Sequence, residues 1–139
     1  MNDHQRMVKE FMTAFGQNTP EKFSVNEYPF ALRASLIEEE AREFVHAASN
    51  GNPIEMIDAM CDLLYVTYGA AVAMGIDLEP FFSEVHRSNM SKLGEDGKPI
   101  YRSDGKVIKP AHWSPPDLLS VLHAELGLQY TPEVPDAAS

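Results

Sequence analysis

The chain has 139 residues, of which 44% are hydrophobic and 23% are charged, and its formal net charge is −10 at pH 7. This size and composition are typical of a single globular domain. The negative charge argues against unaided binding to nucleic acid, because the phosphates would be repelled. It does not exclude a small phosphate ligand that binds together with a metal ion.

Hydrophobic periodicity predicts four main helices. In the first of them, apolar side chains recur at the i, i+3, i+4 and i+7 spacing of one helix face; they are Val8, Phe11, Met12 and Phe15. Gly16, the turn sequence NGNP at residues 50–53 and Gly75 are suited to ending helices. We therefore expect helices over residues 3–16, 30–49, 53–74 and 80–93.

The helix predicted over residues 53–74 is the most apolar part of the chain. Asp58 and Asp62 interrupt it, so we expect no membrane-spanning segment. The N-terminal sequence MNDHQRMVKE lacks the hydrophobic run of a signal peptide. The single cysteine, Cys61, cannot form an internal disulfide and fits a reducing compartment. We therefore expect a cytoplasmic protein.

The C-terminal third has a different composition. Residues 94–110, GEDGKPIYRSDGKVIKP, predict a loop with a weak hairpin around Asp104-Gly105. A short helix is predicted over residues 117–126, and residues 127–139 are predicted to be a disordered tail. The expected fold is all-α: one domain over residues 1–126, built as a bundle of about four helices with an irregular C-terminal segment. Because such a bundle is thin, we expect dimerisation to complete it.

Carboxylates overlap the apolar faces of two consecutive predicted helices. On a helical projection Glu39, Glu40 and Glu43 lie within about 60° of Leu36. On the next helix, Glu55 and Asp62 lie within about 60° of Asp58. For one helix alone, a solvated acidic stripe is the usual interpretation.

Two features favour a metal site instead. Like charges at this spacing repel one another, and burying a carboxylate is costly unless another group compensates. Arg33 and Arg42 are the only arginines or lysines on the two helices, and Arg33 is two turns from the glutamates, where we expect it to pair with them. A divalent cation is the simplest compensation, and carboxylate-only ligands suit Mg²⁺ or Mn²⁺. The pattern therefore predicts a metal site between two antiparallel helices.

These residues also resemble a known family. The run Glu39-Glu40-x-x-Glu43 is similar to the EExxE signature of the MazG-like all-α nucleoside triphosphate pyrophosphatases, a superfamily that includes dimeric dUTPases and phosphoribosyl-ATP pyrophosphatase. Three further segments follow in the order seen in that superfamily; they are DLLYV at 62–66 with Gly69, SNMSK at 88–92, and GKVIKP at 105–110 with Trp113 and PPD at 115–117. The resemblance covers residues 5–118.

The resemblance implies a reaction and a metal site. Members hydrolyse a nucleoside triphosphate to the monophosphate and pyrophosphate, so Glu39, Glu40, Glu43 and Asp62 would hold Mg²⁺, with Mn²⁺ as a substitute, and Glu39 or Glu40 would also activate water. The family's Glu-x-x-Asp motif ends at Asp62, which places its Glu on Ala59; Asp58 is then expected to serve as the partner ligand. Glu55-x-x-Asp58 also fits the motif, but in a register that loses the DLLYV match.

The resemblance also implies substrate contacts. Asn89 and Lys92 are one helical turn apart, so they face the same way and would contact phosphate or sugar. Lys106 and Lys109 would close over the triphosphate, and Trp113 would stack on the base. Solvated lysines, a helix-terminal Asn and a packing Trp are the alternatives. The implied substrate is dUTP, or else dGTP or dCTP, and the implied assembly is a homodimer or homotetramer.

Two other functions stay open. Glu43-x-x-His46 resembles half of a di-iron carboxylate site, although such bundles need a second Glu-x-x-His on another helix. A non-catalytic helical dimerisation module with acidic surfaces is the other alternative; it predicts that neutralising Glu39 or Asp62 leaves function unchanged or raises stability.

Overall fold

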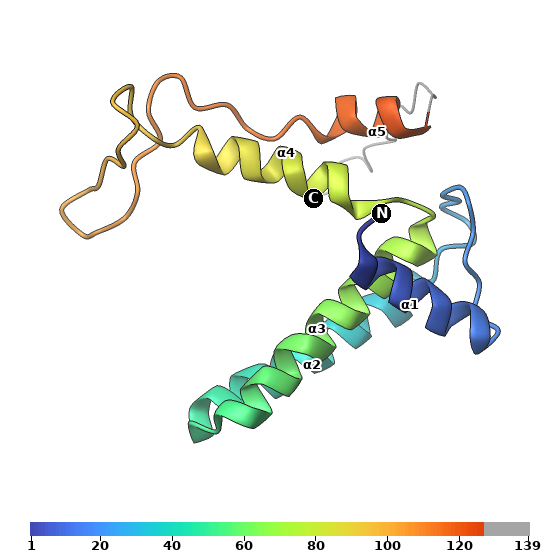
Figure 1. The fold of residues 1–139 in the computed structure, drawn as a ribbon. Coiled ribbons are helices and arrows are strands. Elements are labelled where there is room, and N and C mark those ends of the chain that lie inside the picture. The colour runs from blue at the N-terminus through green and yellow to red at the C-terminus, as the bar shows by residue number, and fades with distance from the viewer. Residues whose placement is uncertain (127–139) are drawn as a thin grey trace, which may run out of the picture. The chain divides into compact units, whose positions relative to one another are not determined.

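The computed structural model describes residues 1–126, and the predicted disordered tail at 127–139 lies outside the described residues. Within residues 1–126 the regular elements are five α-helices and no β-strand, which confirms the all-α prediction (Figure 1). The helices are α1 (Asp3–Ala14), α2 (Phe30–Asn50), α3 (Pro53–Met74), α4 (Leu78–Met90) and α5 (Leu118–Leu126). The chain divides into two compact units, Met1–Leu78 and Glu79–Ser139. The prediction of one domain over residues 1–126 stays a prediction.

The first unit is an antiparallel α2–α3 hairpin with α1 packed across α3 (Figure 1). The predicted turn at 50–53 joins the hairpin: Gly51 adopts the left-handed conformation, and the Asn52 side chain accepts hydrogen bonds from the backbone N–H groups of Ile54 and Glu55. Pro53 fits the first turn of α3, where its missing N–H costs nothing. The core lies at the other end of the hairpin and consists of Val8, Met12, Val72 and Ala73, with Tyr28 and Tyr68 against it.

Gly75 fixes the loop between α1 and α2 against the end of α3. Its φ is +69°, and a Cβ there would lie 2.7 Å from the carbonyl oxygen of Pro20 and 2.8 Å from the backbone nitrogen of Lys22. Gly51 has nearly the same φ, +65°, but a Cβ there would meet nothing within 4 Å. The two glycines therefore differ in crowding and share the same backbone conformation.

We expect Gly75→Ala to destabilise the protein by about 2 kcal/mol, because left-handed strain and displacement of residues 20–22 add together. Gly51→Ala, the matched control, carries the strain alone and should cost about 1 kcal/mol. Urea unfolding followed by circular dichroism measures both. Equal costs would contradict the close packing of the loop on α3.

α3 is long and apolar enough, by length and composition alone, to cross a membrane, and no other helix of residues 1–126 is. One such helix is weak evidence, because the core helix of a soluble protein meets the same criterion. Asp58 and Asp62 lie on α3, and the helix packs along both α1 and α2. The expectation of no membrane-spanning segment stays a prediction.

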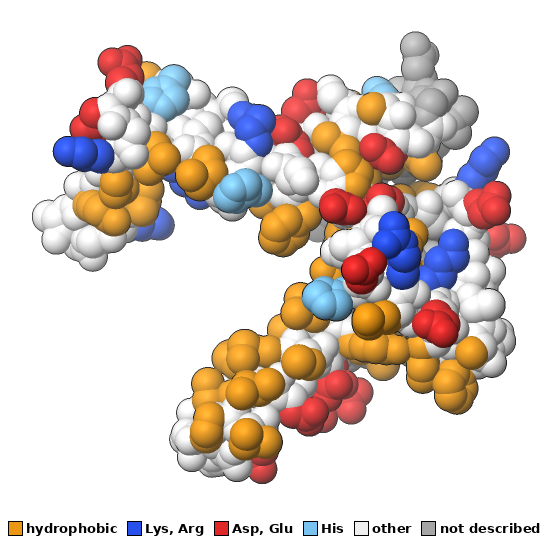
Figure 2. Space-filling view, in the orientation of Figure 1, with side chains coloured by type: hydrophobic (Ala, Val, Ile, Leu, Met, Phe, Trp, Pro, Cys, Tyr) orange, Lys and Arg blue, Asp and Glu red, His pale blue; other side chains and the backbone are white. Residues whose placement is uncertain are grey.

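Large hydrophobic side chains are exposed along the α2–α3 hairpin, away from the small core (Figure 2). They are Val45 on α2 and Ile54, Ile57, Met60 and Leu64 on α3, between 44% and 73% exposed. Those on α3 recur at intervals of three to four residues and so form a stripe. A continuous apolar stripe of this kind is typical of a surface that a protein partner covers.

The second unit contains α4, α5 and the segment between them. Arg87 joins these parts: its guanidinium donates to the Glu84 carboxylate, to Ser114 Oγ and to the Pro115 carbonyl. The Arg87 hydrogen bond and the Asp117 N–H lower the pKa of Glu84 to about 2. The predicted hairpin around Asp104-Gly105 is confirmed by an antiparallel bridge between Tyr101 and Val107.

The predicted ends of α4 were wrong by two to three residues. The helix ends at Met90 instead of residue 93, because Leu93 leaves it to form an antiparallel bridge with Pro99. It also begins at Leu78, two residues before the Pro80 at which the sequence suggested a start. Asn89 therefore lies in the last turn of α4, and Lys92 lies in the turn that follows it.

Candidate metal centre

Three carboxylates meet between α2 and α3. Glu40 and Glu43 on α2 and Asp62 on α3 each offer an oxygen, and these three oxygens all lie within 4.8 Å of one another. Glu40 and Asp62 are half-buried, whereas Glu43 is exposed. Glu40 and Glu43 share a face because they are three residues apart, and the antiparallel hairpin brings Asp62 opposite them. The predicted meeting of carboxylates from the two helices is therefore confirmed in geometry.

Glu40 and Asp62 both resist ionisation. Burial raises the pKa of Glu40, and the nearby charges of Glu43 and Asp62 raise it further. Burial also raises the pKa of Asp62, with further contributions from Asp58 and Glu43. Each added negative charge at such a cluster is unfavourable until a cation binds.

A divalent cation fits this donor set. One carboxylate oxygen of Glu40, Oε2, is buried and has no hydrogen-bond partner. A buried oxygen of this kind needs a partner, and a bound metal ion would supply one. The donors are oxygens only, as Mg²⁺ and Mn²⁺ prefer. Among residues 1–126 no histidine joins the cluster. The His46 ring nitrogen Nε2 instead lies 3.2 Å from the Asn50 side chain in an exposed position, so the di-iron alternative gains no support.

Two of the five predicted ligands lie beside the cluster and not in it. Glu39 is exposed on α2, and its charge contributes to the raised pKa of Glu40. Asp58 is exposed on α3 and contributes likewise to Asp62. Ala59, which occupies the family's Glu position, is 4% exposed. Asp58 is thus the acidic side chain that α3 places next to Asp62.

The predicted substrate-contacting residues lie in the second unit, where the structure pairs them locally. The ammonium of Lys92 donates to Asn89 Oδ1 at 3.0 Å, so the two side chains do face the same way. The ammonium of Lys109 lies 4.3 Å from the centre of the Trp113 ring, a cation–π contact. Lys106 is exposed, and its backbone N–H donates to Asp104. Their contact with a substrate stays a prediction.

Arg33 departs from expectation. The sequence suggested that it would pair with the glutamates of α2, but within residues 1–126 its side chain forms no ion pair or hydrogen bond. It is buried beside Gly69 of α3. Sequence spacing places Arg33 on the same side of α2 as Glu40, but it does not reveal that the loop between α1 and α2 and Gly69 of α3 would surround it.

Together, two antiparallel helices and a carboxylate cluster define an all-α protein with a candidate divalent-metal centre. Comparison with known proteins adds the family. The sequence profile of the phosphoribosyl-ATP pyrophosphohydrolase family matches residues 8–89. That segment is more than half of the chain and includes all five predicted metal ligands, so the chain belongs to this family, and the predicted superfamily resemblance is confirmed.

Two individual relatives are of interest. An uncharacterized protein of Acanthamoeba polyphaga mimivirus is 34% identical over 107 residues, which is 73% of this chain but 40% of that protein, so the chain spans less than half of its relative. A crystal structure of a candidate NTP pyrophosphohydrolase from Exiguobacterium sp. 255-15 is 27% identical and aligns over 91% of this chain and 95% of its own. Its TM-score is 0.43.

Proposed function

We propose that the protein is a Mg²⁺-dependent nucleoside triphosphate pyrophosphohydrolase, converting a (d)NTP and water to the (d)NMP and pyrophosphate. One observation carries the proposal: Glu40, Glu43 and Asp62 converge, with a buried unpartnered oxygen on Glu40, inside the segment that matches the family. Mn²⁺ is the expected substitute ion because its ligand preferences are similar.

The residues divide the chemistry between them. Glu40, Glu43 and Asp62 would hold the cation, with Asp58 completing the set from α3. A cation bound there supplies the positive charge that lets a polyphosphate approach and that stabilises charge developing on the phosphate oxygens.

The water oxygen attacks the α-phosphorus, the bond from that phosphorus to the bridging oxygen of the β-phosphate breaks, and pyrophosphate leaves. Glu39 or Glu40 would accept the water's proton.

The substrate proposal is tested by a panel. We propose dUTP first, with dGTP and dCTP next, and the family's name adds phosphoribosyl-ATP as a further compound to test. The protein would be incubated with each compound and Mg²⁺ or Mn²⁺, with monophosphate and pyrophosphate read separately. Stoichiometric pyrophosphate from one or two compounds would support the proposal. No product from any compound with either ion would contradict it and favour a non-catalytic helical dimerisation module.

We also propose that the protein works as a homodimer or homotetramer in which the stripe on α3 is covered by a second copy. This stripe lies beyond the small core of the first unit, as expected for a bundle that association completes (Figure 2). An apolar face of several large side chains is unfavourable in water unless it is covered.

Ile57→Glu is expected to weaken association about tenfold or more, since a carboxylate would be placed in the apolar contact. Size-exclusion chromatography with light scattering over a dilution series measures the change. Val25→Glu, at a residue 61% exposed in the loop before α2, is the matched control and should leave the oligomer intact. An unchanged oligomer in Ile57→Glu, or a wild-type monomer, would rule out this interface.

A further inference from the structure

Arg33 is a buried cation for which residues 1–126 supply no paired anion. It is 9% exposed, and its Nε is fully buried without a hydrogen-bond partner. No carboxylate within residues 1–126 forms an ion pair with it. An unpaired buried charge is costly, so this position is explained most simply by an anionic ligand that the guanidinium receives.

Arg33 lines a cavity of about 660 Å³ in the first unit. The walls come from the loop between α1 and α2, from α2 itself and from Ala73 of α3. Among residues 1–126, Lys22 adds a second cation to the lining, Glu27 is its one carboxylate, and Gln17, Asn18 and Ser24 add polar groups. The volume lies in the range of small-molecule sites, and the cations outnumber the acids by two to one.

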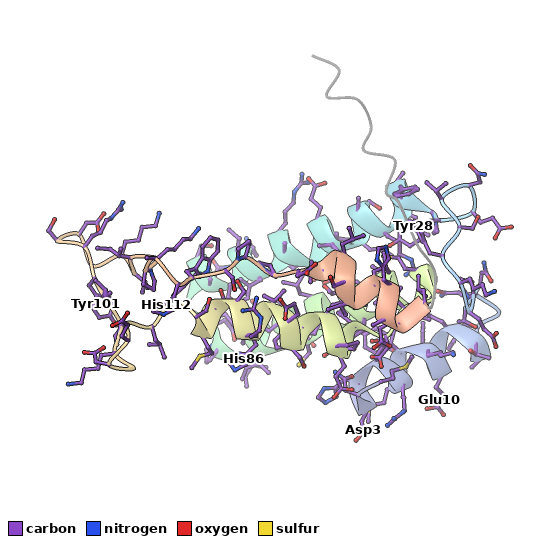
Figure 3. The ribbon with its side chains drawn as sticks, turned by 90° about the horizontal axis from the view of Figure 1, so that it is seen from above. Asp3, Glu10, Tyr28, His86, Tyr101 and His112 are labelled. Atoms are coloured by element: carbon purple, nitrogen blue, oxygen red, sulfur yellow. The ribbon has the colours of Figure 1, made fainter. Side chains whose placement is uncertain are left out.

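The walls of this cavity are held in place. Tyr28, labelled in Figure 3, donates its hydroxyl to the Ala70 carbonyl at 3.2 Å, which ties the end of the loop to α3. The Gln17 N–H donates to the Met12 carbonyl at 2.8 Å at the loop's other end. Gly75 allows residues 20–22 to pack directly on α3. The loop is therefore a fixed wall, as a preformed site requires.

α3 also makes room for the guanidinium. A Cβ at Gly69 would lie 3.0 Å from one terminal nitrogen of Arg33. Gly69 thus forms a shallow recess in which the Arg33 head group rests. A methyl group at this position would push the guanidinium by a few tenths of an ångström without straining the helix, because α3 is an ordinary α-helix there.

Arg33 lies on the same side of α2 as the metal centre. Arg33 and Glu40 are seven residues apart, which places them about 20° apart around the helix and about 10.5 Å apart along its axis. Leu36, which lies between them, also lines the cavity. A phosphate chain bound at the carboxylates would extend toward Arg33 on this side of the helix.

We propose that the cavity binds a phosphate group, with the Arg33 guanidinium as its main contact and Lys22 as its second cation. The planar fork of arginine matches phosphate oxygens and gives paired, charge-assisted hydrogen bonds. The phosphate comes either from the outer phosphates of the substrate, which rests on the proposed function, or from free phosphate or pyrophosphate, which does not.

The test uses the full chain and three variants: Arg33→Met, Arg33→Lys and Gly69→Ala. The first arm measures binding of inorganic pyrophosphate and of inorganic phosphate by calorimetry, with and without Mg²⁺. We expect pyrophosphate binding to weaken at least tenfold in Arg33→Met and less in the other two. Arg42→Met is the matched control, because Arg42 is an exposed arginine on the same helix, paired with Glu38.

The second arm measures kcat and KM for the best nucleotide of the panel. A rise in KM of tenfold or more in Arg33→Met with little change in kcat, together with loss in the first arm, identifies the substrate's outer phosphates as the occupant. Loss in the first arm alone identifies free phosphate or pyrophosphate, and it would stand even if the protein hydrolysed nothing.

Thermal melts measure whether each variant is folded and whether pyrophosphate stabilises it. If Arg33 is retained to bind an anion, Arg33→Met should melt higher than the wild type. Pyrophosphate should raise the melting temperature of the wild type and of Arg42→Met but not that of Arg33→Met. Wild-type pyrophosphate affinity in Arg33→Met would overturn the proposal. So would a change in base preference with unchanged pyrophosphate affinity, since the cavity would then hold the base.

Discussion

Glu40→Gln is expected to lower kcat/KM for the preferred nucleotide about 10³-fold or more. The substitution keeps the size of the side chain but replaces a charged ligand oxygen with a neutral amide. Loss of a metal ligand forfeits several kcal/mol of transition-state stabilisation, and each 1.36 kcal/mol corresponds to a tenfold change in rate. Glu40 is chosen because it carries the buried, unpartnered oxygen of the cluster. Steady-state assays of pyrophosphate release, with Mg²⁺ at saturation, measure the effect.

The matched control for this substitution is Glu38→Gln. Glu38 lies on the same helix, is exposed, and pairs with Arg42 outside the cluster. It should retain nearly full activity and lose at most about 0.5 kcal/mol of stability. Equal losses in the two variants would show a general effect of charge, and full activity in Glu40→Gln would remove Glu40 from the site.

The helices could be predicted well because their signals are local. The NGNP turn and Gly75 each act within a few residues, so the bounds of α2 and α3 agree with the structure to within one residue. The periodicity of Val8, Phe11 and Met12 predicted α1, which ends at Ala14, two residues before the expected end. The end of α4 could not be predicted in this way. It is set by pairing of Leu93 with Pro99, across a turn whose geometry the sequence does not specify.

For the same reason, only part of the candidate site could be predicted from the sequence. Glu40 and Glu43 share a face by spacing alone, and Asp62 joins them because a short turn forces the hairpin to be antiparallel. Which carboxylates come within reach depends on how the two helices are rotated against each other, and single-helix projections do not contain that information. This is why the sequence grouped Glu39 and Asp58 with Glu40, Glu43 and Asp62, although the structure places these two side chains beside that cluster. The burial of Arg33 depends on the loop between α1 and α2 and on α3, which the residue spacing within α2 does not place, so it was missed.

Raising the pH should lower the stability of the metal-free protein, and adding Mg²⁺ should restore it. The pKa values of Glu40 and Asp62 are raised in the metal-free folded protein, so the folded state holds more protons than the unfolded state. Their contribution to stability is therefore fully present below the ordinary carboxyl pKa, near 4. It is lost as the pH rises through the folded values. The cluster should therefore make the metal-free protein melt at a higher temperature in mild acid than at neutral pH.

Mg²⁺ should reverse this loss, because it binds the ionised carboxylates of the folded state. At about 100 times its dissociation constant it would add about 2.7 kcal/mol, or about 10 °C in melting temperature for a chain of this size. The shift should be large at pH 7 and vanish near pH 4, where protons compete for the same oxygens. Melts over a grid of pH and Mg²⁺ concentration, with EDTA as the metal-free reference, measure both effects.

Asp62→Asn separates a metal centre from a solvated acidic surface. Removing one charge of the cluster should raise metal-free stability at pH 7 by about 0.5 kcal/mol and abolish most of the Mg²⁺ shift. Asp58→Asn should give a smaller loss of the shift if Asp58 is a ligand and none if it only neighbours Asp62. Glu10→Gln, at an exposed position on α1, is the control and should keep the full shift. A wild-type shift in Asp62→Asn would mean that Mg²⁺ binds elsewhere, and the pyrophosphohydrolase proposal would lose its metal centre.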